Sequence, residues 1–223
     1  MVAGLLMSVS HWIEVIGFYF RWIGTSYGLA GLGYSTHVQI ATISRLGTFF
    51  AYPIIGYLID TGQSSLIIIY FLLSYSTFFI LLNITTIKFN NINVYDQIFR
   101  WYAIKVTKNP LVKDRIKKSH DQYYREYGLM VYGYISYTII VGGVFLTYLL
   151  SSANPDYRVT IIMLGPTLTS IGTLLSTIFF DPRVSWHLDT KVNAENMITD
   201  IIKCRTYAAI TFLIISIIYL CID

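Results

Sequence analysis

Charged residues are scarce in this chain. Of its 223 residues, 13% are Asp, Glu, Lys or Arg, whereas about one-quarter of an ordinary soluble domain is charged. It has only two cysteines, Cys204 and Cys221, which a single helix would hold about 25 Å apart, too far for a disulfide. These shortages exclude a disulfide-stapled domain and a charged disordered tail, and the long uncharged runs exclude a soluble α/β enzyme.

Hydrophobic residues take the place of the missing charge and make up 55% of the chain. A membrane-spanning helix needs roughly 20 predominantly apolar residues, and six segments meet that requirement. We therefore predict an all-α, polytopic membrane protein with a single transmembrane domain over residues 1–223. The predicted spans are about 2–20, 36–59, 64–87, 127–151, 158–180 and 204–222.

Lysine and arginine are unevenly divided between the predicted loops, and such residues concentrate on the cytoplasmic side of a membrane. Residues 88–126 hold nine of the sixteen, residues 181–205 hold four, and the first loop adds Arg21. The opposite side has only Arg158. We therefore predict that these three loops are cytoplasmic and that both termini are external.

The loop 88–126 mixes apolar and basic side chains at a spacing of three to four residues, which is typical of helices that lie on a membrane surface. Nine cations and four acidic residues give it a net charge of +5. We expect an amphipathic cytoplasmic segment between the third and fourth spans that contacts anionic membrane lipids. Two interpretations stay open, a solvated basic loop and a specific headgroup site. Its central basic residues are Lys113, Arg115, Lys117 and Lys118.

Three ionisable residues, His11, Glu14 and Arg45, fall well inside predicted spans and away from their ends, where a charge normally faces a partner or a watery cavity. His11 and Glu14 are three residues apart and share a helix face, and Arg45 lies at a similar depth in the second span. We expect one polar cluster in which Arg45 binds phosphate, because its guanidinium offers five donors in a planar fork. Glu14 would be its charge partner. The alternative is a Glu14–Arg45 ion pair that only joins two helices.

The remaining candidates lie near helix ends. Arg21 and Arg158 either extend to the membrane interface or contact a substrate. The dipeptide Asp181-Pro182 is expected to end the fifth span, and Asp60 begins a predicted tight hairpin. Four glycines between residues 24 and 33 suggest a mobile first loop.

Two groups of residues form the pattern of a known family. The first comprises His11-Trp12-Ile13-Glu14, Tyr19, Arg21, Gly24, Ile43-Ser44-Arg45, Pro53, Gly56 and Ile59-Asp60, and the second comprises Asn154-Pro155-Asp156-Tyr157-Arg158-Val159-Thr160, Asp181-Pro182 and Asp189. Together they resemble the Amj family of bacterial lipid II flippases over roughly residues 8–62 and 135–190. The chain departs from the family at Thr25-Ser26-Tyr27, where family members carry basic residues.

The resemblance implies transport of lipid II, the undecaprenyl-diphosphate-linked peptidoglycan precursor, from the inner to the outer leaflet of the bacterial plasma membrane. The family pattern makes two sets of residues candidates. Those for substrate binding are Arg45, Arg21, Arg158 and His11, and those for charge pairing or proton coupling are Glu14, Asp60 and Asp181.

Two rival functions stay open at this point. One is a flippase for another polyprenyl-diphosphate-linked sugar. The other is a membrane phosphatase or transferase acting on such a lipid, which would use clustered carboxylates with a metal or a His nucleophile beside arginines. We expect no catalytic residues, metal, cofactor or nucleic-acid partner. A homodimer is a hypothesis, because six helices enclose only a small cavity.

Overall fold

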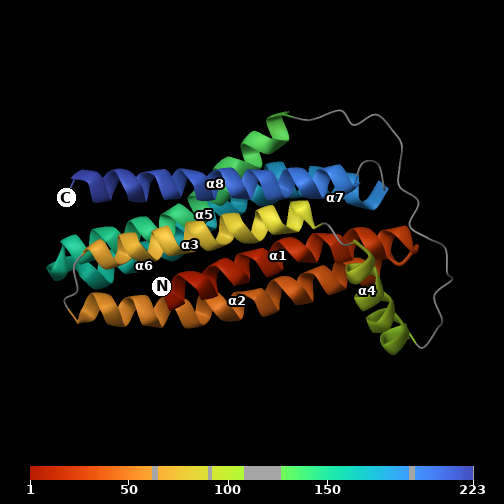
Figure 1. Cartoon of the computed structure of the whole chain (residues 1–223), viewed down its shortest axis with the longest axis horizontal. Coiled ribbons are helices and arrows are strands. Elements are labelled where there is room, and N and C mark those ends of the chain that lie inside the picture. The colour runs from red at the N-terminus through yellow and green to blue at the C-terminus, as the bar shows by residue number, and fades with distance from the viewer. Residues whose placement is uncertain (62–64, 90–91, 108–126, 191–193, 223) are drawn as a thin grey trace.

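Every element that the structure describes is a helix or a helical turn. The computed structural model (Figure 1) describes residues 1–61, 65–89, 92–107, 127–190 and 194–222, and no strand occurs in these ranges. The prediction of an all-α polytopic membrane protein is confirmed, because six described helical segments are long and apolar enough to cross a membrane. The elements are α1 (Val2–Ser26), α2 (Ala30–Asp60), α3 (Ser65–Lys88), α4 (Ile92–Thr107), α5 (Tyr127–Ala153), η1 (Pro155–Tyr157), α6 (Arg158–Leu175), η2 (Ser176–Phe180), α7 (Asp181–Thr190) and α8 (Ala194–Ile222).

The first two helices meet in a turn of only three residues, so the prediction of a mobile glycine-rich loop is wrong. Three of its four glycines lie inside helices. A Cβ atom added to Gly24 would overlap the Cα atom of Gly33, so these glycines let the backbones of α1 and α2 approach closely. Gly28, in the turn, has a φ of 73°, a conformation that only glycine adopts without strain.

The fifth span does not end at Asp181-Pro182 as predicted. A π-helical turn, η2, follows α6, and α7 continues the helix to Thr190. Pro182 lies just after this π-helical turn, and a local change to π winding is one way in which a membrane helix accommodates a proline that lacks the backbone N–H donor. The Ser176 hydroxyl in η2 donates a hydrogen bond of 3.0 Å to Oδ1 of Asp181.

The last span begins ten residues earlier than predicted, at Ala194 instead of residue 204. The apolar count ends where Lys203 and Arg205 appear, but the helix does not. Its buried side chains include Ile198, Ile201, Ile202, Ala208, Ala209 and Phe212, which recur at helical spacing on both sides of Arg205. Arg205 is therefore a residue of the helix interior and not of a loop.

The helices form an elongated bundle with both termini toward one end and α4 at the other (Figure 1). α2 packs along α1, α6 along α5, and α8 along α3 and α5. In the apolar windows of the spans, 50% of α1 is buried, against 17% of α2 and 11% of the segment Pro155–Asp189. α2 and the segment Pro155–Asp189 therefore contribute few side chains to the packed core of the bundle.

Helix α4 leaves the bundle at the end opposite the termini (Figure 1). It buries Phe99 and Ala103 and exposes Val94 and Trp101, so an amphipathic helix between the third and fourth spans is confirmed. The hydroxyl of Tyr27 donates a 2.7 Å hydrogen bond to Asp96. Burial and this carboxylate raise the pKa of Tyr27 to about 12, so it remains a donor at neutral pH. The predicted cluster of central basic residues, Lys113 to Lys118, lies outside the described residues.

Candidate functional site

A cavity of about 880 Å³ lies inside the bundle. One wall is α2, from Tyr34 to Tyr52, and the facing wall is formed by α6, η2 and α7. Residues of α1, α5 and α8 line it between these walls. The stretch of α2 that lines the cavity extends from the middle of the bundle toward the α4 end. Its ionisable lining residues are His11, Glu14, Arg21, His37, Arg45, Asp181 and Arg205.

Glu14 is paired with Arg205 and not with Arg45. Nη2 of Arg205 donates to Oε1 of Glu14 at 2.9 Å, joining α1 to α8. The predicted Glu14–Arg45 pair is therefore wrong. Both arginines line the same cavity, but a shared depth does not specify which one turns toward the carboxylate.

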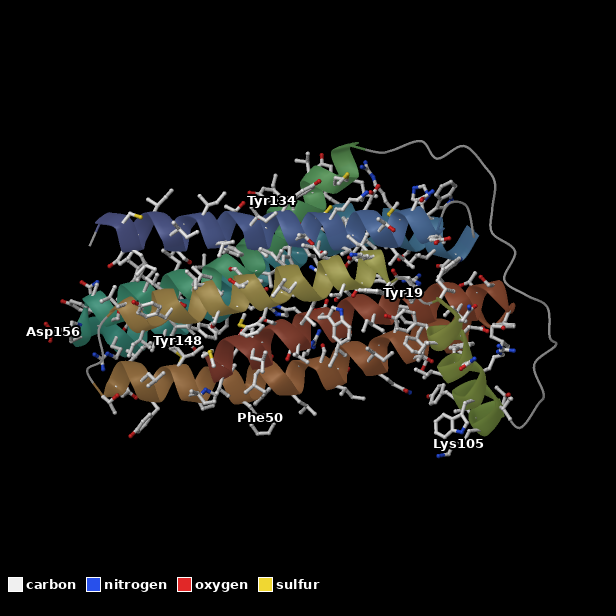
Figure 2. All side chains as sticks on the ribbon, in the orientation of Figure 1. Tyr19, Phe50, Lys105, Tyr134, Tyr148 and Asp156 are labelled. Atoms are coloured by element: carbon white, nitrogen blue, oxygen red, sulfur yellow. The ribbon has the colours of Figure 1, made fainter. Side chains whose placement is uncertain are left out.

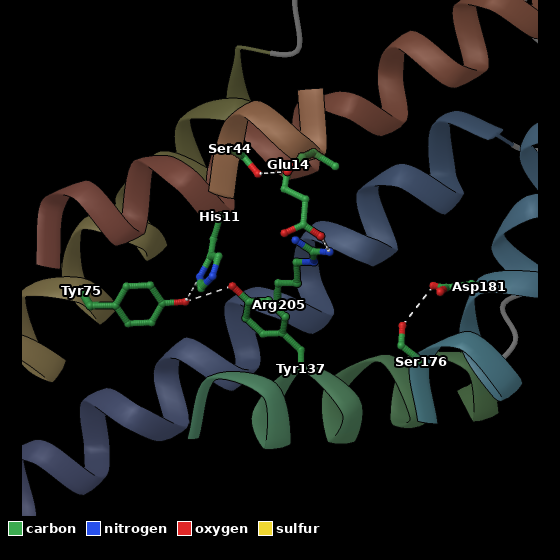
Figure 3. Close-up of polar contacts among 9 residues, drawn as sticks. His11, Glu14, Ser44, Tyr75, Tyr137, Ser176, Asp181 and Arg205 are labelled. Carbon is green, nitrogen blue, oxygen red and sulfur yellow. Dashed lines mark hydrogen bonds and ion pairs between the residues drawn. The ribbon is translucent and has the colours of Figure 1, made fainter. Parts of the chain in front are cut away.

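Arg205 is enclosed on several sides, as Figure 3 shows. Its side chain is 11% exposed, and its guanidinium carbon lies 4.9 Å from the centre of the Tyr137 ring on α5, within the range of a cation–π interaction. Nη1 of Arg205 is buried and has no hydrogen-bond partner among the described residues. Nη2 of this cation is thus paired, and Nη1 is left for a further acceptor.

His11 belongs to a separate polar chain beside this ion pair. Its Nδ1 lies 2.8 Å from the hydroxyl of Tyr75 on α3, which lies 3.0 Å from the hydroxyl of Tyr137. The three rings pack edge-on or stacked with Phe79. This network fixes the Tyr137 ring that faces Arg205 (Figure 3), and so links His11 to the cation through aromatic contacts.

Arg45 lies on α2, on the cavity wall opposite α6 and α7. It is exposed, and its guanidinium makes no hydrogen bond or ion pair within the described part of the chain. Thr48 bonds only to the backbone carbonyl of Arg45, at 2.7 Å. Arg45 is therefore a cation on the cavity surface whose guanidinium has no partner among the described residues.

The two arginines predicted at helix ends each hold an aspartate. Arg21 on α1 makes a forked contact with Asp189 on α7, at 3.2 and 2.7 Å, near the α4 end of the cavity. Arg158 lies 3.4 Å from Asp60 and so joins the end of α2 to the start of α6. This second pair lies at the opposite end of the bundle and outside the cavity lining.

Asp181 faces the cavity from α7 and accepts the hydrogen bond from Ser176. A group of hydroxyl-bearing side chains accompanies it on the lining. They are Thr42, Ser44 and Thr48 on α2, Ser136 on α5, Thr169 and Thr173 on α6, Ser176 and Thr177 on η2, and Ser185 on α7. The cavity therefore offers oxygen acceptors as well as cations.

The charges on the lining are balanced when the partner of Arg21 is counted. Arg21, Arg45 and Arg205 stand against Glu14 and Asp181 on the lining and against Asp189, which pairs with Arg21 beside it. No group of three His, Cys, Asp or Glu side chains able to hold a metal occurs in the described ranges. An anion with several oxygens matches the free donors of Arg45 and Arg205.

Of the seven candidate residues, the three of the predicted polar cluster, His11, Glu14 and Arg45, line the cavity together with Arg21 and Asp181, which were expected at helix ends. Arg158 and Asp60 do not. Arg205 was missed because it was counted among the basic residues of a cytoplasmic stretch. A signal for it existed: it lies three and four residues from Ile201, Ile202, Ala208 and Ala209, on the apolar stripe of its helix.

Comparison with known proteins adds no relative. No family model, curated protein or solved structure matches the chain. The functional interpretation therefore depends on the cavity, on the charges that line it and on the family pattern in the sequence.

Proposed function

We propose that this protein is a flippase for an anionic lipid whose headgroup is joined to a polyprenyl tail through a diphosphate, with lipid II as the substrate that the Amj resemblance implies. The observation that carries the proposal is the cavity itself. It contains an unpaired arginine, a second arginine with an unused donor and many hydroxyl groups, between helices that expose apolar side chains. Such a combination suits a molecule with a polar anionic head and an apolar tail.

The walls of the cavity would let the headgroup of such a substrate bind the protein while its tail stays in the lipid. α2 and α6 are the two spans with the least buried surface, and they face each other across the cavity. Phe50 on α2 points away from the bundle (Figure 2), and Met163 and Leu174 on α6 are exposed. A headgroup held between these helices would leave its tail in the surrounding acyl chains. The volume of the cavity falls within the roughly 300–1,000 Å³ of typical ligand sites.

The two ion pairs at the ends of the bundle suit the alternation that flipping requires. The Arg21–Asp189 pair lies at the α4 end, and the Arg158–Asp60 pair joins the two cavity walls at the far end. Breaking the first would admit a headgroup from the predicted cytoplasmic side, and breaking the second would release it on the other side. This assigns Arg21, Asp60 and Arg158 to gating in our proposal.

The membrane potential can supply the driving force. Moving one charge through 100 mV corresponds to about 2.3 kcal/mol. A diphosphate carrying two negative charges would therefore gain about 4.6 kcal/mol per 100 mV on moving outward across an inside-negative membrane. Transport toward the outer leaflet then requires no nucleotide hydrolysis.

The test is flipping by the purified protein in proteoliposomes of defined lipid composition. Lipid II and a second polyprenyl-diphosphate-linked sugar are incorporated, and the fraction accessible to an external reagent is followed in time. We expect lipid II to exchange between leaflets faster than in protein-free vesicles. Exchange of only the second lipid would favour the alternative flippase, and release of free headgroup would favour a phosphatase or transferase. No exchange of either lipid would refute the proposal.

A further inference from the structure

We propose that Glu14 is an internal substitute for the substrate phosphate on Arg205, and that an incoming diphosphate displaces it. This inference depends on the proposed function for the identity of the anion, and it adds Arg205 as a ligand and Glu14 as a competitor. This exchange would keep the charge of Arg205 balanced while the site is empty, and it would make binding selective for anions.

The first observation is the unequal burial of the two partners. The side chain of Arg205 is 11% exposed and that of Glu14 is 35% exposed. Arg205 is held by the Tyr137 ring as well as by Glu14, whereas Arg205 is the only hydrogen-bond partner that the described residues give the Glu14 carboxylate. The carboxylate can therefore leave while the guanidinium stays in place.

The second observation is the unused donor of Arg205. Nη1 is buried and has no acceptor among the described residues, although buried donors in proteins are almost always paired. A carboxylate bound through one oxygen to Nη2 leaves this donor unsatisfied. A phosphate group carries enough oxygens to accept from both nitrogens in the forked geometry that guanidinium groups favour, so it satisfies the group that Glu14 does not.

The third observation is the position of Arg45 on the same cavity. It lies on α2, whereas Arg205 lies on α8, and it has no partner of its own within the described ranges. Two guanidinium groups from different helices, one free and one held by a replaceable carboxylate, match the two phosphates of a diphosphate. A neutral lipid would gain nothing that offsets the loss of the Glu14–Arg205 contact, so the pair excludes it.

Displacement also explains why the site contains an acid at all. If Arg45 and Arg205 were both free, a diphosphate would bind tightly and leave slowly. Glu14 competes for Arg205 and so weakens binding, and its return would assist release. Removal of Glu14 should therefore tighten binding and slow transport, opposite to the effect of removing a binding residue.

Equilibrium binding of geranylgeranyl diphosphate to the purified full-length protein in lipid nanodiscs tests this directly. We expect Glu14→Gln to lower the Kd about tenfold and Arg205→Gln to raise it about tenfold, as the gain or loss of one charge-assisted contact would do. The double variant should bind as weakly as Arg205→Gln alone. Glu195→Gln, a carboxylate of α8 outside the cavity lining, is the matched control, and geranylgeraniol is the neutral ligand that no variant should bind differently.

Arg205→Lys keeps the charge and guards against a failure of Arg205→Gln to fold. We expect it to fold and to bind the diphosphate more weakly than the unaltered protein, because an ammonium group lacks the fork. If Glu14→Gln and Arg205→Gln both weaken binding and the double variant restores it, the pair is architectural and the inference is wrong. If Glu14→Gln lowers the Kd and Arg205→Gln raises it, but no lipid is flipped, the anion site is supported and the proposed function is wrong. If flipping occurs and Arg205→Lys leaves both Kd and rate unchanged, the inference alone fails.

Discussion

A charged side chain within a bilayer is retained where it has a partner or reaches water. Arg205 meets the first condition, through Glu14 at 2.9 Å. Arg45 depends on the second, because it is exposed on the cavity and has no partner among the described residues. The two arginines therefore differ in their resting state, and substitutions at them should differ in effect. A change at Arg45 strands no buried acid, so it tests ligand binding without disturbing an ion pair.

At Arg45 we expect Arg45→Lys to reduce the initial flipping rate by at least about tenfold, equivalent to about 1.4 kcal/mol, because it keeps the charge but loses the paired donors. Arg45→Ala should be inactive. Rates are measured in proteoliposomes at equal protein content. Arg183→Ala is the control, since Arg183 is exposed on α7 beside Tyr132 and outside the cavity lining. Full activity of Arg45→Ala would remove Arg45 from the site.

Some residues of the site can be predicted from the sequence and others cannot. His11, Glu14 and Arg45 could be found because an ionisable residue in an apolar run is conspicuous. Their partners could not, because sequence gives depth along a helix but not the rotation of one helix against another. That rotation follows here from contacts such as Gly24 against Gly33. Arg205 lay at the very start of its predicted span, 204–222, and was counted with the basic residues of the loop 181–205, so it was assigned to the wrong environment.

Among the helices, α1 and α2 show how small residues fix an interface. Gly24 lies so close to Gly33 on the neighbouring helix that neither tolerates a side chain, whereas an added Cβ atom at Gly31, also on α2, meets nothing within 4 Å. In a bilayer, close backbone approach replaces the hydrophobic effect as a source of helix association. The two positions therefore form a matched pair with the same residue type and opposite surroundings.

We expect Gly24→Ala to destabilise the protein by about 1–3 kcal/mol, the usual cost of overpacking, with a lower Tm. Gly31→Ala should leave Tm unchanged or raise it, since alanine in a helix is favoured over glycine by roughly 0.5–1 kcal/mol. Thermal unfolding of both variants in one detergent measures the difference. Equal Tm values for the two variants would show that the α1–α2 contact is looser than the structure indicates.

The helix ends were the least predictable part of the fold. Apolar counts locate the six spans, but they end at the first charged residues, whereas the hydrogen-bonded helices of α1 and α8 continue past Arg21 and upstream of Lys203. The composition does not predict the π-helical turn before Asp181. A proline normally marks a helix boundary, so Pro182 predicts an end to the helix there instead. Extension of these ends places Arg21 of α1 and Asp189 of α7 side by side.

The two ends of the whole molecule differ, and any directional function depends on this difference. α4 projects from one end and both termini lie toward the other (Figure 1). The cavity lining reaches from mid-bundle toward the α4 end. If that end faces the cytoplasm, the substrate proposed above would enter from the cytoplasmic leaflet, and the potential would drive its anionic head outward. The orientation is thus a condition of the proposed direction of transport.

We predict that α4 is cytoplasmic and that the η1 turn is external, because fourteen of the sixteen basic residues fall on the α4 side in the sequence-based count. Single cysteines replace Lys105 on α4 and Asp156 in η1, which lie at opposite ends of the bundle (Figure 2), after Cys204 and Cys221 are changed to alanine. An impermeant maleimide added to intact spheroplasts should label position 156 and not position 105, and both should react after the membrane is permeabilised. The reverse pattern would place the cavity's α4 end outside, and import would then replace export as the direction that the geometry favours.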